Sequence, residues 1–330
     1  MSAKYDTERG TALIAALLLV ALMATVSVQL LDMARFAVFR TSHIDTRSDA
    51  YWQALGAREF AEGVIQRGVT GEAMASDIPW LNETQVFPTD IGLVTGTITD
   101  GNNCLNINAL AEGLGDDAQQ TEQSEVQRLR DRYDVLMDRI NAPTGASRNL
   151  KAQIIDWVDR NTRPEPGGAE DSTYQRYETP YRTANQLMVE REEMLALPEM
   201  TPNFYAFLEP WLCALPTPQQ PPLNVNTLTL EQAALLASAF SGRLDISDAE
   251  GVLFRRPPGG YDTLEDFFDD PAISALELDD LDRSAVTLRS RWFFMQVSVR
   301  TEETRFTMSQ LVELNEAQQI NRYQLRFGAM

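Results

Sequence analysis

The N-terminal region contains one long run of apolar residues. From Thr11 to Leu31 no residue carries a charge, and beyond Thr11 the polar members of the run are Thr25, Ser27 and Gln29. At the rise of an α-helix this run reaches roughly 31 Å, which is enough to cross the hydrocarbon core of a bilayer. The pattern therefore predicts a transmembrane helix.

This run does not resemble a signal peptide. The apolar part of a signal peptide typically has about 7 to 15 residues and ends at a small-x-small cleavage site. Here the run is longer, and the sequence SVQLLDMARF that closes it offers no such site. Basic residues occur on both sides of the run, so their distribution does not set its orientation in a membrane.

The helical pattern continues after the apolar run. There is no proline before Pro79, and Ala54, Ala57, Ala61 and Val64 recur at helical spacing. We expect one helix of about fifty residues, apolar on all sides in its first half and amphipathic in its second. Gly68 and Gly71 are expected to end it.

Two groups of strands flank a helical region. The stretch GLVTGTITDGNNCLNIN predicts two short strands joined by a turn at residues 100–102, and residues 291–328 predict further strands with a hairpin turn at residues 301–304. Between the groups, four segments have helical patterns. The expected fold class is α+β: a long N-terminal helix packed on a small antiparallel sheet, with a large, mostly helical insertion. The four segments are 121–140, 149–160, 228–240 and 247–254.

A short motif occurs twice. CLNINAL at 104–110 and PLNVNTL at 222–228 share Leu-Asn-aliphatic-Asn-x-Leu. We expect the asparagines to hydrogen-bond backbone groups where an extended segment turns into a helix, with Thr227 or Thr229 followed by Glu231 as capping residues. The second copy resembles the start of a helix-hairpin-helix fold, but it lacks the basic residues that binding to phosphates needs, so a structural role is preferred.

Composition excludes several classes of function. The chain has 330 residues, 44% of them apolar, which is enough for a substantial core, and a formal net charge of −20, which argues against nucleic-acid binding. It has one histidine, His43, just after the apolar run, and no G-x-S-x-G, H-E-x-x-H, P-loop or dinucleotide motif. A hydrolase that needs a histidine in the folded domain is therefore disfavoured.

Cys104 and Cys213 are the two cysteines. They are too few and too far apart for a local C-x-x-C metal site. Outside the cytoplasm a disulfide between them is the economical interpretation, and the alternative is a pair of buried free thiols.

An acidic loop is the candidate metal site. The stretch IIDWVDRNTRPEPGGAEDSTYQRY places oxygen ligands around a turn rich in proline and glycine, which suits calcium, an ion that accepts six to eight oxygens. It does not match an EF-hand loop, and a solvated acidic loop at helix ends is the alternative. The runs 265–270 and 277–282 are further acidic candidates, more typical of helix ends and surfaces. The candidate ligands in the loop are Asp156, Asp159, Asn161, Glu170 and Asp171.

The N-terminus resembles that of type IV pilin-like proteins. The leader at residues 1–10 ends in Arg9-Gly10, a small polar residue follows at Thr11, and the long helix comes next. The resemblance implies that prepilin peptidase cleaves between Gly10 and Thr11 and that the new amine is methylated. It also implies segments 11–31 in the inner membrane, 32–67 as the amphipathic continuation, 68–108 and 290–330 as the sheet, and 109–289 as the insertion, with the globular domain in the periplasm.

One position narrows the resemblance. The family normally has glutamate at the fifth mature position, and here that position is Ala15. An isolated acid in a bilayer is costly, and in the family it pairs with the amine of the subunit above, which a subunit at the tip does not have. The missing acid, the large domain and the Asp-Trp-x-Asp and Gly-Ala-Glu-Asp-x-x-Tyr motifs are similar to general secretion pathway protein K, a minor pseudopilin of type II secretion.

The resemblance implies a function that is not enzymatic. Proteins of this family are expected at the tip of the pseudopilus, where they initiate its assembly with the I-type and J-type minor pseudopilins and other pseudopilins and aid export of folded proteins across the outer membrane. Members bind calcium in the helical domain. The alternative hypothesis is a membrane-anchored periplasmic enzyme or binding protein.

Overall fold

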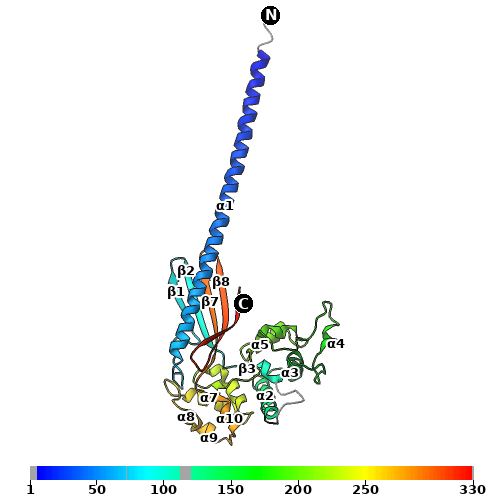
Figure 1. The fold of residues 1–330 in the computed structure, drawn as a ribbon, viewed down its shortest axis with the longest axis vertical. Coiled ribbons are helices and arrows are strands. Elements are labelled where there is room, and N and C mark those ends of the chain that lie inside the picture. The colour runs from blue at the N-terminus through cyan, green and yellow to red at the C-terminus, as the bar shows by residue number, and fades with distance from the viewer. Residues whose placement is uncertain (1–5, 72, 112–119, 329–330) are drawn as a thin grey trace.

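One helix dominates the shape of the molecule. The computed structural model describes residues 6–71, 73–111 and 120–328, and in it α1 runs without a break from Asp6 to Gly68, a length of 63 residues. Its upper part stands clear of the rest of the chain, and its lower part lies against a sheet (Figure 1). The expected single helix is confirmed, although it begins earlier and is longer than the pattern indicated. In the described residues it is the one helix long and apolar enough to cross a membrane.

A close contact explains where α1 ends. A Cβ on Gly68 would overlap the Trp80 ring, so only glycine lets the ring pack there. Gly71 follows with φ +82°, a conformation that side chains with a Cβ rarely adopt. The two glycines therefore end the helix as the sequence predicts.

The sheet has five antiparallel strands in the order β1-β2-β7-β8-β9. The expected turn at residues 301–304 joins β7 to β8, with the amide of Thr301 donating to the carbonyl of Thr304 at 2.9 Å. The strands are β1 Thr84–Thr89, β2 Gly92–Asp100, β7 Trp292–Arg300, β8 Arg305–Leu314 and β9 Ile320–Phe327.

The expected hairpin at residues 100–102 is wrong. The hairpin partner of β2 is the preceding strand β1, and after Asp100 the chain leaves the sheet for the insertion. The turn makes a different connection, because Asn102 Oδ1 accepts hydrogen bonds from the amides of Arg291 and Trp292, both at 3.0 Å. The asparagine therefore joins the start of the insertion to its end.

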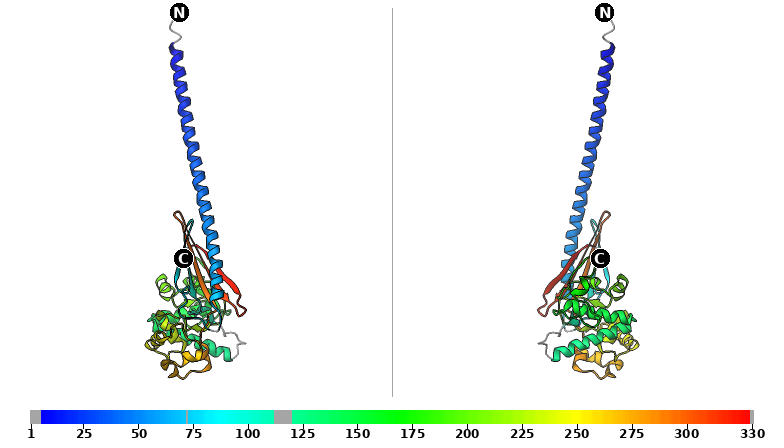
Figure 2. Two further views of the ribbon diagram at one scale, coloured as in Figure 1. Left: turned by 90° about the vertical axis from the view of Figure 1, so that its left-hand side faces the viewer. Right: turned by 90° about the vertical axis from the view of Figure 1, so that its right-hand side faces the viewer.

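The C-terminal part of α1, from about Ala50, covers one face of the sheet, as the side views in Figure 2 show. Ala50 and Ala54 pack with strand residues such as Val297 and Val299, and Ile65 packs with Phe293, all of them buried. The small alanine side chains let the helix backbone approach the strands closely. The α+β fold class is thereby confirmed.

The insertion lies at the end of the sheet farthest from the N-terminus (Figure 1). It contains the largest core, which includes Leu105 and Ile107, so these two residues pack with the insertion. All four predicted helical segments are helical. The elements are β3 Leu105–Asn106, η1 Ile107–Ala111, α2 Gln120–Arg139, α3 Thr144–Val158, α4 Asp171–Tyr174, η2 Arg191–Ala196, α5 Pro202–Leu208, β4 Leu212–Cys213, β5 Leu223–Asn224, η3 Leu230–Gln232, α6 Ala233–Ala239, α7 Ile246–Arg255, α8 Leu264–Phe268, α9 Pro271–Ser274, α10 Asp280–Ser284 and β6 Val286–Thr287.

The second asparagine of the repeated Leu-Asn-x-Asn motif makes the same pattern of hydrogen bonds in both copies. The side chain of Asn108 donates from Nδ2 to the backbone carbonyls of Met188 and Leu215 at 2.9 and 2.8 Å. Its Oδ1 accepts from the backbone N–H of Met188 at 2.8 Å. Likewise, Asn226 Nδ2 donates to the backbone carbonyls of Met74 and Tyr261, and Asn226 Oδ1 accepts from the backbone N–H of Tyr261.

The expected backbone hydrogen bonds of the motif are therefore confirmed. The capping residue of the second copy is Thr229, and its partner in the capping box is Gln232 instead of Glu231. The repeat thus fixes two similar strand-to-helix connections inside the insertion.

Candidate functional site

The first candidate site is the surface of α1. In the described residues, the most apolar stretch of this helix has none of its residues buried by the rest of the chain. Large apolar side chains stay exposed below that stretch too, among them Phe36, Phe39, Trp52 and Phe60. A surface of this kind is covered in the working protein, by lipid, by a partner or by both.

A groove of about 560 Å³ lies beside the lower part of α1. One wall is a helical face of small or apolar residues spaced three and four apart, including Gly56, Ala57 and Phe60, and the other wall comes from β1, β2 and β7. The rings of Phe60 and Phe87 stand 6.2 Å apart across it. Small residues at this spacing allow close approach of a second helix.

The positions singled out at the N-terminus all lie on α1. Gly10, Thr11 and Ala15 belong to its first turns, and Ala15 is exposed. The lone histidine, His43, lies lower on the same helix, with Nδ1 3.6 Å from a carboxylate oxygen of Glu303. It is close to none of the acidic-loop candidates named above.

The acidic loop is the second candidate site. Asp156, Asp159 and Glu170 are only 0%, 7% and 4% exposed. Burial raises the pKa of Asp156 and of Asp159 to about 6, and the nearby charge of Glu170 adds to both shifts. Burial likewise raises the pKa of Glu170. Three carboxylates are thus held close enough to repel one another.

These carboxylates keep unused acceptor atoms. Asp156 Oδ1 accepts from the amide of Glu165 at 2.9 Å, whereas Asp156 Oδ2 and Glu170 Oε1 are buried without a hydrogen-bond partner. A Cβ on Gly168 would overlap Asp156 Oδ2, so the glycine leaves that oxygen its space. The chemistry of the set, buried oxygens with uncompensated charge, fits a hard cation.

The other two predicted ligands are placed differently. Asn161 donates to Asp159 Oδ2 at 2.7 Å, and Asp171 accepts from the amide and hydroxyl of Thr183. In the described part of the chain no group of three acidic, histidine or cysteine side chains is arranged to hold an ion by itself. An ion here would therefore also need backbone oxygens. Glu165, which the sequence pattern did not single out, adds its charge to the pKa shift of Asp159.

Comparison with known proteins identifies the family. Two family models match, both described as type II secretion system protein K, one over residues 103–217 and the other over residues 223–289. The type II secretion system protein K of Pectobacterium carotovorum subsp. carotovorum is 30% identical over 324 residues, covering 97% of each chain. The chain belongs to the type II secretion system protein K family.

Further relatives agree with this assignment. The type II secretion system protein K of Aeromonas hydrophila is 27% identical over 305 residues, 90% of each chain. The fold is also similar to the crystal structure of the GspK-GspI-GspJ complex from the type 2 secretion system of enterotoxigenic Escherichia coli, with a TM-score of 0.74 and 22% identity over 88% of this chain and 100% of that one. As a protein K, the chain is a structural component of a secretion system and not an enzyme.

The boundaries of the two matched regions coincide with the two copies of the internal repeat. Each matched region begins at or just before one Leu-Asn-x-Asn motif, and a proline-rich segment at 218–222 separates them. A disulfide closes the first region: Cys104 and Cys213 are bonded, with Cα atoms 5.8 Å apart. The insertion of this protein K therefore consists of two consecutive units.

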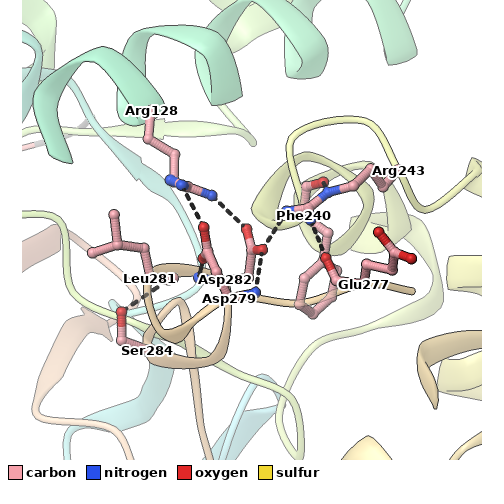
Figure 3. A network of polar contacts seen from close by, with 8 residues as sticks. All are labelled: Arg128, Phe240, Arg243, Glu277, Asp279, Leu281, Asp282 and Ser284. Carbon is pink, nitrogen blue, oxygen red and sulfur yellow. Dashed lines mark hydrogen bonds and ion pairs between the residues drawn. The ribbon is translucent and has the colours of Figure 1, made fainter. Parts of the chain in front are cut away.

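Ion pairs join the two units. Arg128 on α2 contacts Asp279 and Asp282 at 2.7 and 2.8 Å, and Arg243 reaches the second oxygen of Asp282 (Figure 3). Asp266, Asp270 and Asp279 cap short helices through their side chains or capping boxes. The acidic runs 265–270 and 277–282 are thus used at helix ends and in ion pairs. This agrees with the expectation that such runs are more typical of helix ends and surfaces than of metal sites.

Proposed function

We propose that this protein K is a minor pseudopilin at the tip of the type II secretion pseudopilus. It initiates assembly with I-type and J-type minor pseudopilins and so aids export of folded proteins across the outer membrane. The observation that supports the proposal is the bare apolar surface of α1 with its groove at Gly56 and Phe60. A related protein K was crystallised with GspI and GspJ, which supports the same partners here.

The first part of α1 supports a membrane-anchored precursor. Its apolar stretch would cross the inner membrane once, with the globular domain in the periplasm, where the disulfide of Cys104 and Cys213 can form. Prepilin peptidase would cleave between Gly10 and Thr11, and the new amine would be methylated. The helix could then leave the membrane and pack beside those of other pseudopilins.

Two features support the tip position. Ala15 offers no acid to pair with the amine of a subunit above it. The insertion lies at the end of the molecule opposite the N-terminus, where it would stand above the packed helices (Figure 1). A broad domain at that end would restrict growth of the pseudopilus to the other end.

The acidic loop supports calcium as a structural ion of the insertion. Asp156, Asp159 and Glu170 would hold it together with backbone oxygens, with Asn161 as a further candidate, while Asp171 is engaged with Thr183. A bound cation would neutralise the buried charges and occupy the two oxygens that lack donors. The ion would stabilise the loop and perform no chemistry.

Filling the groove tests the assembly proposal. The position of a Cβ on Gly56 has no atom within 4 Å, so Gly56→Leu should fold normally and yet fill the groove. Gly145→Leu is the matched control, because Gly145 also faces open space, on α3. We expect copurification with coexpressed I-type and J-type partners to fall at least tenfold for Gly56→Leu and to stay unchanged for Gly145→Leu. Equal recovery of both variants would contradict the proposal.

A further inference from the structure

A second cavity lies between the two units of the insertion. It has a volume of about 450 Å³ and is bordered by α2, the proline-rich segment and the region of α10. Its lining is mixed: apolar residues such as Val126 and Leu281 alternate with polar ones, which include two arginines, Arg128 and Arg132, together with Glu125, Gln219 and Ser284. Glu125 is exposed at the surface, so the cavity is open to solvent on that side.

Arg132 is the unusual member of this lining. Its side chain is only 7% exposed, and among the described residues it donates no hydrogen bond; its Nε is buried without an acceptor. A guanidinium has five N–H donors, and a buried one is normally paired with an acid or with carbonyl groups. Arg256, a comparable arginine, donates to the carbonyls of Val225 and Leu228.

The neighbouring acid makes no hydrogen bond or ion pair with Arg132 in the described part of the chain. Among the described residues, Asp282 is the one acid that acts on the charge of Arg132. However, one oxygen of Asp282 already accepts from Arg128, and the other contacts Arg243 and accepts from the amide of Asp279 (Figure 3). Three arginines thus surround one buried carboxylate.

The charge on Arg132 persists at neutral pH. Burial lowers the pKa of its guanidinium to about 10, and the attraction of Asp282 only partly opposes that shift. The group is therefore cationic under physiological conditions, with its N–H donors at the wall of a cavity. A buried cation without a hydrogen-bonded partner is unfavourable until an anion reaches it.

We propose that this cavity binds a single oxyanion, a carboxylate or a phosphate, against Arg132. The planar fork of a guanidinium pairs two oxygens of one such group. Arg128 lines the same wall but is already paired with Asp279 and Asp282, so the unpaired charge is that of Arg132. The nearby Glu125 limits the site to one anion. A small free anion or an acidic group of a partner protein supplies the same chemistry. Because α2 and α10 belong to different units, a bound anion would link the two units, as the ion pair of Arg128 with Asp282 already does.

Thermal unfolding of the full-length chain in detergent tests this site. The melting temperature is followed in calcium-free buffer while phosphate or acetate replaces chloride at constant ionic strength. We expect a saturable rise, of about 5 °C at a hundred times Kd, for at least one of the two anions. A response to acetate alone would indicate a carboxylate of a partner as the occupant, and a response to phosphate a free oxyanion.

Variants of two arginines on the same helix make the test specific. Arg132→Met removes the unpaired charge, so we expect it to fold at least as stably as the parent in chloride and to lose the response. Arg132→Lys keeps the charge and should retain a weaker response. Arg139→Met is the control, because Arg139 lies on α2 but is paired with Asp245 and does not line the cavity. A parent without a saturable response, or a response that persists in Arg132→Met, would overturn the proposal.

Discussion

Arg322 on β9 donates hydrogen bonds to both carboxylate oxygens of Glu62 on α1, from Nε at 2.8 Å and from Nη2 at 2.7 Å. Glu62 is 5% exposed, so its charge is compensated mainly by this pair and more weakly by Arg58, whose Nε lies 3.8 Å from Glu62 Oε1. The two residues are 260 positions apart in the sequence. The pair fastens the last strand of the sheet to the helix proposed to assemble.

Glu62→Gln should therefore loosen the contact between α1 and the sheet. Hydrogen bonds to charged groups contribute more than neutral ones, and we expect the free energy of unfolding to fall by about 1 to 3 kcal/mol in chemical denaturation. Glu59→Gln is the control, since Glu59 also contacts Arg322 but its side chain is 54% exposed; it should change stability by less than about 1 kcal/mol. Equal effects would show that burial of Glu62 does not matter.

Processing at the leader can be read directly from the purified protein. We expect the mature chain isolated from cells that contain prepilin peptidase to begin at Thr11, as measured by mass spectrometry of its N-terminal peptide. Gly10→Val should abolish cleavage, because a bulky residue should not enter the small pocket expected for the residue before the cut. An intact Met1 in the parent would contradict the proposed maturation.

Ala15 provides a test of the tip position. Ala15→Glu adds an acid that a tip subunit cannot pair. Its cost at the centre of a bilayer would be about 2.5 to 3.5 kcal/mol, and it is smaller here because Ala15 lies near one end of the apolar run. We expect fewer pseudopili and lower secretion in a complementation assay, with Ala15→Ser as the mild control. Secretion equal to that of the parent would remove the explanation for the missing acid.

A rise in pH should destabilise the insertion, and calcium should stabilise it. The pKa values of Asp156 and Asp159 are raised to about 6, so the folded state binds these protons more tightly than the unfolded chain. Without metal, stability contributed by the two acids is present at low pH and is lost as pH rises from about 4 to about 6. Between pH 5 and 7.5 we expect a loss of about 1 kcal/mol for each.

Calcium should restore this stability at pH 7.5, since it binds the ionised carboxylates. The melting temperature of the parent should rise with millimolar calcium, and Asp159→Ala should abolish the rise. Asp171→Asn is the control, because Asp171 is partly exposed and hydrogen-bonded to Thr183. A parent that does not respond to calcium would leave the loop as a plain acidic turn.

The disulfide should matter most to the first unit of the insertion. Cys104 and Cys213 are 109 positions apart, and closing a loop of that length stabilises a domain by about 4 to 5 kcal/mol in the chain-entropy model. We expect the Cys104→Ala and Cys213→Ala double variant to lose most of this in urea denaturation. A loss below about 1 kcal/mol would show that packing alone holds the start and the end of the first unit together.

Much of this architecture could be predicted from local patterns. The course of α1 follows from its apolar run, from the absence of proline and from Gly68, and the β7–β8 hairpin follows from alternation around Thr301. The hairpin at Asp100 was predicted wrongly. The chain does turn there, but the turn leads from β2 into the insertion instead of joining two paired strands. The side chain of Asn102 bonds residues 291 and 292, which no local pattern reveals.

The candidate sites were predictable to different degrees. Asp156, Asp159 and Glu170 could be selected because they surround one turn in the sequence, whereas the turning of Asp171 toward Thr183 depends on a tertiary contact. The isolation of Arg132 could not be foreseen. It depends on Arg128 and Arg243 taking the oxygens of Asp282, a residue far along the chain.

The insertion leaves and rejoins the sheet between neighbouring strands. Asp100 ends β2, the antiparallel partner of β7, and the two chain crossings are bound together by Asn102 and by hydrogen bonds from Ser290 and Thr227 to Asp100. A short turn could close the same gap. Under the proposed tip role, a secretion apparatus can consequently change the size of the insertion at this one gap while β2 and β7 keep their pairing.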